Sequence, residues 1–401
     1  MNVLMLCGEI PYPPHGGSRM RVYQFIRALA ERHRITLLAC QYEGDECEDS
    51  AVLGALCRVV TVRWQEPEAL ACMRSSGALA AQLAYGRSLL LDSAPWVAQY
   101  FRLPAFQTRL REMLAAEPFD VVHVEDTAMM ALLPAALNVP VVLSIQNVEY
   151  WRAARAGSAG MGQRIDVWKL RRYEQTAFER ATVCCPTSAL EAEQVRRLAP
   201  AARVQVIANG VDVGEFTPDD RQNTGSPALI FTGTLSYAPN AEGIAWFMRD
   251  VWPLIAAAVP GVQLDIVGRE PPPEVLALVS ERVRVSGDVP DMRPYLQRAW
   301  LAIVPVLHGG GTRLKILEAM ACALPVVSTA IGAEGLAVTP GRDILIADEP
   351  AAFAAHVVRL LGDALLCKML GQAGRALVEG HYEWRVIGAA LASAYELALC
   401  Q

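Results

Sequence analysis

Short apolar runs alternate with longer stretches of helical spacing along the whole chain. The apolar, β-branched runs predict six strands in the first half, at 3–7, 35–39, 59–62, 121–124, 141–145 and 204–207. A second series follows at 229–232, 262–267, 283–285, 301–306, 326–328 and 344–346. Almost wholly apolar strands that alternate with helices are typical of parallel sheets covered on both faces. The pattern therefore predicts an α/β fold with doubly wound parallel sheets.

The two series are separated by a polar stretch rich in turn residues. It reads VDVGEFTPDDRQNTGSP from position 211 and has the composition of a linker. A chain of 401 residues is long enough for two domains. We therefore predict domains at 1–208 and 226–380, with a helix at 384–400 that packs back on the first. Because ligands of doubly wound sheets bind beyond the carboxyl ends of the strands, we expect the site in a cleft between the domains.

Composition excludes several classes of protein. The net charge of −6 provides no overall positive field for nucleic acid. Ten cysteines include no C-x-x-C pair, which predicts reduced thiols in a cytoplasmic protein. The N-terminal MNVLMLCGEI has no basic region before its apolar run, so no signal peptide is expected. The uncharged stretch 127–145 is interrupted by Pro134, Asn138 and Pro140, so no transmembrane helix is expected there.

The strongest candidate site is HGGGTRLKILEAMACALPVV at 308–327, which follows a predicted strand. Three glycines lead into a helix whose first turn carries Arg313 and Lys315, although the helix dipole disfavours cations there. An external anion would resolve the conflict, because backbone N–H groups and two cations would converge on one phosphate-sized site. Only three of the 36 basic residues are lysines, so Lys315 beside the glycines is notable. The alternative is a solvated basic helix start.

This segment resembles family 4 of the nucleotide-sugar glycosyltransferases when it is taken with TGTLSYAPNAEGIAWF at 232–247, VIANGVD at 206–212 and GDVPDMRPYL at 287–296. PYPPHGGSRMR at 11–21, FDVVHVED at 119–126 and RRYEQTAFERA at 171–181 extend the resemblance over almost the whole chain. It implies the GT-B fold, with two Rossmann-like domains facing across a cleft. It also implies metal-independent transfer of a sugar from a nucleoside diphosphate-sugar to an acceptor hydroxyl, with retained anomeric configuration.

The chain departs from the family's pattern at the phosphate clamp. The common Gly-Arg-Leu-x-x-x-Lys motif aligns with 233–239, where Thr234 and Pro239 stand in place of both cations. We expect Arg313 and Lys315 to replace them. This departure suggests a glycine-triplet subtype that resembles sugar transferases of exopolysaccharide clusters.

The resemblance assigns Glu318 to the ribose hydroxyls, although the usual partner of the family's E-x7-E pair is here Gly310. Spacing alone equally allows Glu318 to pair with Lys315 one turn away. The resemblance also places Gly16 and Gly17 against the diphosphate or the transferred sugar. The alternative for these two glycines is an ordinary turn between a strand and a helix.

Polar residues also lie at or after the ends of two predicted strands of the first half, and His123 is expected to end the first of them at the side of the cleft. By resemblance, His123 matches the histidine of an Asp-x-x-His segment near the transferred sugar, where it would bond a sugar hydroxyl. A lone histidine in a strand is otherwise usually a satisfied core residue. Either Glu125 or Asp126 could face the acceptor, and Asn147 and Glu149 follow the next predicted strand.

The expected catalytic residues are His123, Arg313 and Lys315. The expected donor-binding residues are Gly16, Gly17, Gly233, Thr234, Val289, Gly309, Gly310, Gly311, Thr312, Arg313, Leu314, Lys315 and Glu318. The expected acceptor-binding residues are Arg19, Glu125, Asn147 and Glu149. No D-x-D pair and no His/Cys cluster with ligand spacing occurs, so no metal is expected. No cofactor is expected either, because the nucleotide-sugar is a substrate, with a UDP-sugar slightly favoured over a GDP-sugar.

The acceptor is expected to be a glycan, a lipid-linked saccharide or a small natural product. Residues 151–200 carry nine Arg or Lys against five Asp or Glu, which would suit peripheral contact with the inner face of a membrane or simply a solvated face. Two alternatives keep the fold. One is a noncatalytic nucleotide-sugar-binding subunit, and the other is a GT-B epimerase, which would need acid and base carboxylates around the sugar.

Overall fold

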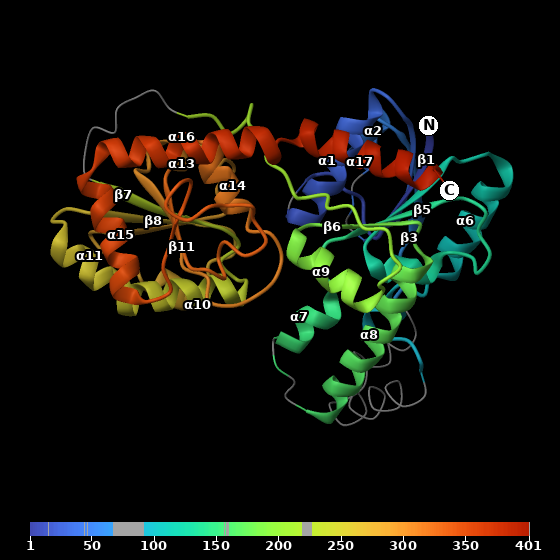
Figure 1. The fold of residues 1–401 in the computed structure, drawn as a ribbon, viewed down its shortest axis with the longest axis horizontal. Coiled ribbons are helices and arrows are strands. Elements are labelled where there is room, and N and C mark those ends of the chain that lie inside the picture. The colour runs from blue at the N-terminus through green and yellow to red at the C-terminus, as the bar shows by residue number, and fades with distance from the viewer. Residues whose placement is uncertain are drawn as a thin grey trace. The chain divides into compact units, whose positions relative to one another are not determined.

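The computed structural model describes residues 1–14, 16–43, 45, 47–66, 92–155, 157, 160–218 and 227–400. The chain divides into two compact units. Unit 1 comprises Met1–Ala208 and Ile387–Gln401, and unit 2 comprises Asn209–Val386. Each unit contains a six-stranded parallel sheet with helices packed on its faces (Figure 1). The prediction of two doubly wound parallel sheets is therefore confirmed.

Unit 1 has the strand order β3-β2-β1-β4-β5-β6. The strands are β1 (Asn2–Cys7), β2 (Arg34–Gln41), β3 (Arg58–Arg63), β4 (Val121–Glu125), β5 (Val141–Ile145) and β6 (Val183–Pro186). The helices are α1 (Gly17–Ala30), α2 (Cys47–Gly54), α5 (Trp96–Tyr100), α6 (Pro104–Ala116), the 3-10 helix η1 (Thr127–Leu132), α7 (Glu149–Arg155), α8 (Met161–Arg180), α9 (Ala189–Leu198) and most of α17 (Trp384–Leu399).

Unit 2 has the strand order β12-β11-β10-β7-β8-β9. The strands are β7 (Ala228–Thr232), β8 (Gln263–Gly268), β9 (Val283–Gly287), β10 (Leu301–Val304), β11 (Val326–Ser328) and β12 (Leu345–Ile346). The helices are α10 (Ala238–Trp246), the π-helix η2 (Phe247–Val251), α11 (Trp252–Ala258), α12 (Pro273–Leu276), α13 (Arg293–Arg298), α14 (Leu314–Ala321), α15 (Pro350–Gly362) and α16 (Ala364–His381).

Apolar side chains on both faces of the central strands build the two cores. All five residues of β4 are buried, and in β1 only the first residue is partly exposed. Val3 of β1 lies opposite both Ile35 and Val121, so β1 pairs with β2 on one side and β4 on the other. In unit 2, β7 likewise lies between β8 and β10. The strand order changes direction beside these central strands. Doubly wound sheets bind their ligands at the point where the strand order changes direction.

One predicted strand is corrected. The segment 204–207 forms only an isolated bridge, Cys184 to Val204, along the outer edge of β6. Backbone N–H groups of Cys184 and Ile207 still bond carbonyl groups of Arg203 and Pro186, at 2.8 and 2.9 Å. The sixth strand of unit 1 is instead β6, which the sequence reading missed. Its four residues, VCCP, are too few for an alternating pattern and end in a proline, which disfavours a strand assignment.

The C-terminal helix α17 begins in unit 2 and ends in unit 1. Figure 1 shows it, in red, beside α1 of unit 1. A Cβ at Gly388 would lie only 2.4 Å from that of Ala28, so glycine allows α17 to approach α1 closely. The buried Tyr395 hydroxyl lies 2.8 Å from Nδ1 of His123 in β4. This hydrogen bond ties the helix to the centre of the sheet.

We expect Tyr395→Phe to lower the stability of unit 1 by about 1–3 kcal/mol, because Nδ1 of His123 would be left buried without its partner. For a unit of this size, each kcal/mol lowers Tm by roughly 2–4 °C. Scanning calorimetry of the full chain measures the shift. Tyr237→Phe is the matched control, since that side chain is 46% exposed, and it should leave Tm unchanged. Equal melting of both variants and the wild type would contradict a stabilising role for the bond.

Candidate functional site

The glycine segment forms a tight turn between β10 and α14. Gly309 has φ +109° and Gly311 has φ +80°, a region that residues with a side chain rarely adopt. A Cβ at Gly309 would also lie 3.2 Å from Cγ of Pro239 and from a guanidinium nitrogen of Arg313. The turn therefore depends on glycine for both its backbone conformation and its close packing.

Arg313 is held within this turn. Its side chain is 8% exposed, and its Nη1 donates to the carbonyl groups of Gly310 and of Gly311, the latter at 3.1 Å. Its Nη2 lies 3.5 Å from the carbonyl oxygen of His308. The guanidinium thus braces the glycine turn by bonding the carbonyl groups of the turn itself.

Lys315 reaches across to the end of β7. Its ammonium donates to Oδ1 of Asn240 at 2.8 Å and lies 4.0 Å from the centre of the Phe231 ring. A Cβ at Gly233 would lie 2.7 Å from Nζ, so the glycine after β7 makes room for the cation. Burial and then the charge of Arg313 lower the pKa of Lys315 to about 7. No carboxylate among the described residues forms an ion pair with Lys315.

Glu318 lies one turn further along α14. Burial raises the pKa of its carboxyl to about 7. It forms no hydrogen bond or ion pair within the part of the chain that the structure describes, so the salt bridge to Lys315 that spacing allowed is not formed. The site therefore holds a carboxyl group and an ammonium group, both mostly buried and neither neutralised by an opposite charge at bonding distance.

The other predicted donor residues also lie beyond the carboxyl ends of strands. Gly233 and Thr234 follow β7, and Val289 follows β9, two strands away in the sheet. The turn with Thr312 and Leu314 follows β10, the immediate neighbour of β7. These residues all belong to unit 2. Gly16, with φ +90°, precedes α1 and lies with Gly17 in unit 1.

Unit 1 contains a pocket at the carboxyl ends of β1 and β4, which we call the β1–β4 pocket. Its volume is about 420 Å³. Polar side chains lining it include Glu9, Ser18, Arg19, Glu125, Asp126 and Gln146. Aromatic rings of Tyr42, Tyr100 and Phe101 line it as well. A pocket with carboxylates and aromatic faces suits a saccharide, because hydroxyl groups can donate to the carboxylates while C–H groups pack on the rings.

Two of the four predicted acceptor residues, Arg19 and Glu125, lie in this pocket. Arg19 is already ion-paired there, with Nε 2.6 Å from Glu9 and Nη2 3.9 Å from Asp45. Asn147 does not line the pocket, and its buried Oδ1 has no hydrogen-bond partner among the described residues. Glu149 belongs to a separate pocket, so the structure divides the predicted acceptor residues.

Glu125 is buried and is neutralised from within unit 1. Its carboxylate lies 2.9 Å from Nε2 of His123 and 3.5 Å from Nε of Arg21. Burial alone would raise the pKa of Glu125, but the hydrogen bond with His123 and the charge of Arg21 outweigh it and lower the pKa. Gln146 lies 3.4 Å away and also bonds the Ser18 hydroxyl, at 3.0 Å. The charged form of Glu125 is therefore favoured.

Arg21 links this carboxylate to residues 207 and 208, which end the first stretch of unit 1. Its side chain is 1% exposed, and its two terminal nitrogens donate to the carbonyl groups of Ala208 and Ile207, at 2.9 and 2.8 Å. The guanidinium carbon lies 4.5 Å from the centre of the Phe25 ring. One fully buried cation thus joins α1, β4 and the segment 207–208, where the first stretch of unit 1 ends.

The sequence reading of His123 as a residue at a strand end is corrected. His123 is the middle residue of β4 and is fully buried, because the strand continues through Val124 to the neutralised Glu125. Both ring nitrogens have protein partners, Nε2 with Glu125 and Nδ1 with Tyr395. Nε2–H donation to the carboxylate with Nδ1 accepting from the phenol satisfies both bonds. His123 does not line the β1–β4 pocket.

The sequence reading missed the aromatic side of the pocket. Tyr42 follows β2, and Tyr100 and Phe101 come from the end of α5, so only the folded chain brings them together. Stacking joins them through Trp64, whose ring centre lies 5.2 Å from those of Tyr42 and Tyr100. The position of Tyr42 directly after a predicted strand was the one available signal. No spacing pattern connected it to position 100.

The arginine-rich stretch forms α7, α8, β6 and α9. Arg155 and Arg172 lie over the rings of Trp151 and Trp168, at 4.6 and 5.0 Å from their centres. Among the described residues, no single helix is long and apolar enough to cross a membrane, and only the bent pair α15 and α16 passes that test together. The described residues contain no group of three or more His, Cys, Asp or Glu side chains arranged to hold a metal ion.

Comparison with known proteins agrees with this architecture. HepE from Anabaena in complex with UDP and glucose aligns over 99% of both chains, with a TM-score of 0.64 and 15% identity. Sucrose-phosphate synthase from Thermosynechococcus elongatus aligns over 99% of this chain and 98% of its own, with a TM-score of 0.71 and 20% identity. At such low identity these likenesses concern the fold alone, and they support the GT-B fold.

Several sequence relatives match over only part of the chain. A GDP-mannose-dependent monoacylated alpha-(1-6)-phosphatidylinositol monomannoside mannosyltransferase from Corynebacterium glutamicum is 31% identical over 203 residues, which are 45% of this chain and 53% of that protein. This match and those to two other relatives span only 36–53% of the relatives' own lengths.

Two family models together cover most of the chain. Residues 226–363 match the model described as Glycosyl transferases group 1, which includes the glycine turn and α14. Residues 15–215 match the model described as Glycosyltransferase Family 4, which alone accounts for half of the chain. The protein therefore belongs to family 4 of the glycosyltransferases, with the GT-B fold.

Proposed function

We propose that this chain transfers a sugar from a nucleoside diphosphate-sugar to an acceptor hydroxyl, with retention at the anomeric carbon and without a metal ion. The observation that carries the proposal is Lys315. It is a mostly buried cation with only neutral hydrogen-bonding and ring partners, beside a glycine turn at the carboxyl ends of β7 and β10. A buried charge without a counter-ion is costly, and a bound diphosphate would supply the missing negative charge.

The proposed mechanism stabilises the leaving group. As the bond to the anomeric carbon breaks, negative charge accumulates on the diphosphate, and Lys315 with the amides of the glycine turn would stabilise it. Arg313 is proposed as a positioning residue, since its guanidinium is engaged with the carbonyl groups of the turn. Glu318 would accept hydrogen bonds from the ribose hydroxyls. The acceptor hydroxyl would attack from the face that the diphosphate leaves and would pass its proton to the departing phosphate oxygen.

On the acceptor side, we propose that the β1–β4 pocket receives the acceptor next to Glu125. His123 is proposed as a positioning residue for that carboxylate, because its two nitrogens are bonded inside unit 1. A UDP-sugar is the first donor to test. GDP-mannose is the second, since a relative is named for it.

Donor binding is expected to raise Tm when UDP-glucose, GDP-mannose, ADP-glucose and dTDP-glucose are screened in turn. A donor at 100 times its Kd stabilises by about 2.7 kcal/mol. Lys315→Met should weaken binding by about 1.5–3 kcal/mol, because a charged hydrogen bond to phosphate is lost. Lys368→Met, an exposed lysine on α16, is the matched control and should bind as the wild type does. No stabilisation by any donor, or equal loss in both variants, would contradict the proposed site.

Without an acceptor, the donor that stabilises the protein is also expected to be hydrolysed slowly. High-performance chromatography of the released nucleoside diphosphate measures this hydrolysis. A donor that binds but is never hydrolysed or transferred would favour the noncatalytic subunit instead. Conversion of the donor into its epimer would favour the epimerase.

Donor affinity is expected to fall as pH rises from 7 to 9. Lys315 is charged below its pKa of about 7 and loses its proton above it, so each further pH unit costs up to about tenfold in affinity. Lys315→Arg should remove this dependence, because guanidinium stays charged. Glu318 ionises in the same range and would act in the opposite sense, so Glu318→Gln should show a steeper fall. Calorimetric titration measures each Kd. A pH-independent affinity in Glu318→Gln, where the opposing ionisation is removed, would refute Lys315 as the phosphate-binding cation.

Two further outcomes are expected once transfer is measured. Removal of divalent metal ions with EDTA should leave the transfer rate unchanged. Proton NMR should show that the product keeps the anomeric configuration of the donor. The described residues offer no metal-binding cluster, and in the proposed site Lys315 and the amides of the glycine turn would stabilise the diphosphate charge instead of a metal ion. Activity lost with EDTA and restored by Mg²⁺ would contradict the first expectation, and an inverted product would contradict the second.

A further inference from the structure

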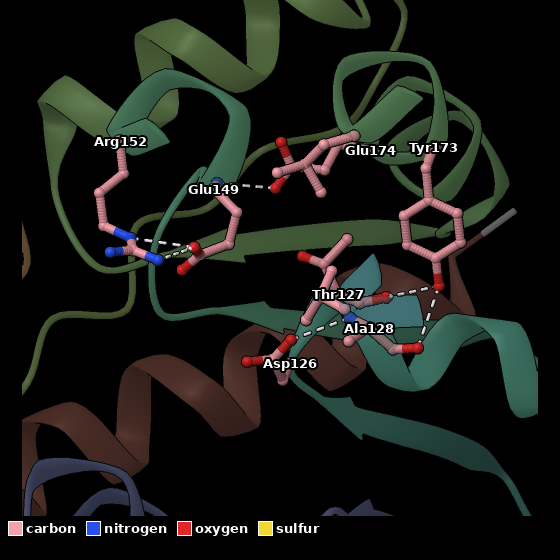
Figure 2. A pocket seen from close by; sticks show the side chains of 9 residues that line it. Asp126, Thr127, Ala128, Glu149, Arg152, Tyr173 and Glu174 are labelled. Carbon is pink, nitrogen blue, oxygen red and sulfur yellow. Dashed lines mark hydrogen bonds and ion pairs between the residues drawn. The ribbon is translucent and has the colours of Figure 1, made fainter. Parts of the chain in front are cut away.

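A second pocket in unit 1 has no role in the proposed function so far. We call it the β4–β5 pocket, because it lies beyond the ends of these strands, between η1, α7 and α8. Its volume is about 220 Å³. Figure 2 shows Glu149 and Glu174 on one side of this pocket and Asp126 and Thr127 on the other.

Most of the charged groups in this pocket are already engaged. Glu149 is ion-paired with Arg152. Glu174 accepts the backbone N–H groups of Glu149 and Tyr150, at 2.8 and 2.9 Å, and so caps α7. Asp126 accepts the N–H of Ala128 through Oδ1 at 2.8 Å, which leaves Oδ2 without a partner among the described residues. One carboxylate oxygen is therefore available to a ligand.

Thr127 gives an independent sign of a ligand. The residue is 4% exposed, and its hydroxyl has no hydrogen-bond partner in the part of the chain that is described. Its carbonyl group is occupied, because it accepts from the Tyr173 hydroxyl at 3.1 Å. A buried hydroxyl without a partner is uncommon in proteins, since it loses its bonds to water and gains nothing. Thr127 lines the pocket beside Asp126, so a bound molecule could bond both.

The charge of the pocket limits the kind of ligand. Burial, and then the nearby Glu149, raise the pKa of Asp126 to about 6, and the same causes raise that of Glu174 to about 8. Near pH 7, Glu174 is therefore largely protonated, whereas Asp126 is mostly ionised. The charges of Glu149 and Arg152 balance each other. About one negative charge remains, which would repel a phosphate or carboxylate group and accept hydroxyl donors.

We propose that the β4–β5 pocket binds a neutral, hydroxyl-rich sugar residue of the acceptor, through Oδ2 of Asp126 and the hydroxyl of Thr127, and that it excludes phosphorylated and acidic sugars. The apolar side chains of Val97 and Leu170 line the same pocket and offer surface for the C–H face of the ring. Asp126 also lines the β1–β4 pocket, so one acceptor can occupy both. Naming the ligand as acceptor rests on the proposed function, whereas sugar binding itself does not.

Saturation-transfer difference NMR on the full chain tests the pocket without donor. The probes are the methyl α-glycosides of glucose, mannose and galactose, together with methyl glucuronide as the acidic counterpart of the glucoside. At least one neutral glycoside is expected to give a saturable signal. Thr127→Val and Asp126→Asn should each weaken that binding at least about tenfold, because each removes a buried hydrogen bond to the sugar. Methyl glucuronide should show no binding that these two substitutions reduce.

Thr176→Val is the matched control. Thr176 is an exposed residue of α8 whose hydroxyl bonds only the carbonyl of Arg172, so this variant should bind as the wild type does. Melting curves establish that each variant is folded. The proposal is overturned if no neutral glycoside binds, if binding survives both Thr127→Val and Asp126→Asn, or if the glucuronide binds equally well and is lost with them.

The two proposals can fail separately. If a nucleoside diphosphate-sugar raises the Tm of the Thr127→Val variant, the proposed donor site is supported, even if no glycoside binds to the β4–β5 pocket. Once transfer is measured, this variant should raise KM for the acceptor and leave donor binding unchanged. If the wild type binds a glycoside but no nucleoside diphosphate-sugar, the proposed donor site is refuted and the proposed sugar site in the β4–β5 pocket is retained.

Discussion

The buried ion pair between Arg21 and Glu125 is the interaction on which unit 1 depends. Removing two charges from water costs several kcal/mol each, so neither side chain would be tolerated at this depth alone. The carboxylate is neutralised by Arg21 and accepts a hydrogen bond from His123, and the guanidinium also bonds the carbonyl groups of Ile207 and Ala208. Through His123, the same network holds Tyr395 of α17. Segments from four distant parts of the chain are thereby fixed around one ion pair.

In unit 2, the mostly buried charge has no counter-ion among the described residues. Lys315 is mostly buried at the corresponding end of the sheet, yet its partners are an amide oxygen of Asn240 and the face of Phe231. Neutral partners satisfy the hydrogen bonds of an ammonium but not its charge. An internal ion pair stabilises a fold, whereas an incompletely neutralised cation creates affinity for an anion. This contrast is the reason why we propose unit 2, and not unit 1, as the side that binds the diphosphate.

Sequence reasoning succeeded where the signal was local. Eleven of the twelve predicted strands correspond to strands of the structure, because a buried parallel strand is a short apolar run that needs no distant partner to be recognised. The glycine turn was recognisable too, since its residues are consecutive. Sequence reasoning failed for β6, which is too short to show a pattern. It also failed for His123, which does not end its strand because β4 continues to Glu125.

By itself, then, the sequence determined the α/β class, the two series of strands, the family and the glycine turn with its two cations. Only the tertiary structure decided how these side chains act. Arg313 and Lys315 are two residues apart, yet the first turns back on its own loop and the second reaches Asn240, 75 positions earlier in the chain. The pockets of unit 1 likewise combine residues from separate strands and helices. Burial and charge compensation are properties of neighbours in space, and spacing along a chain does not record them.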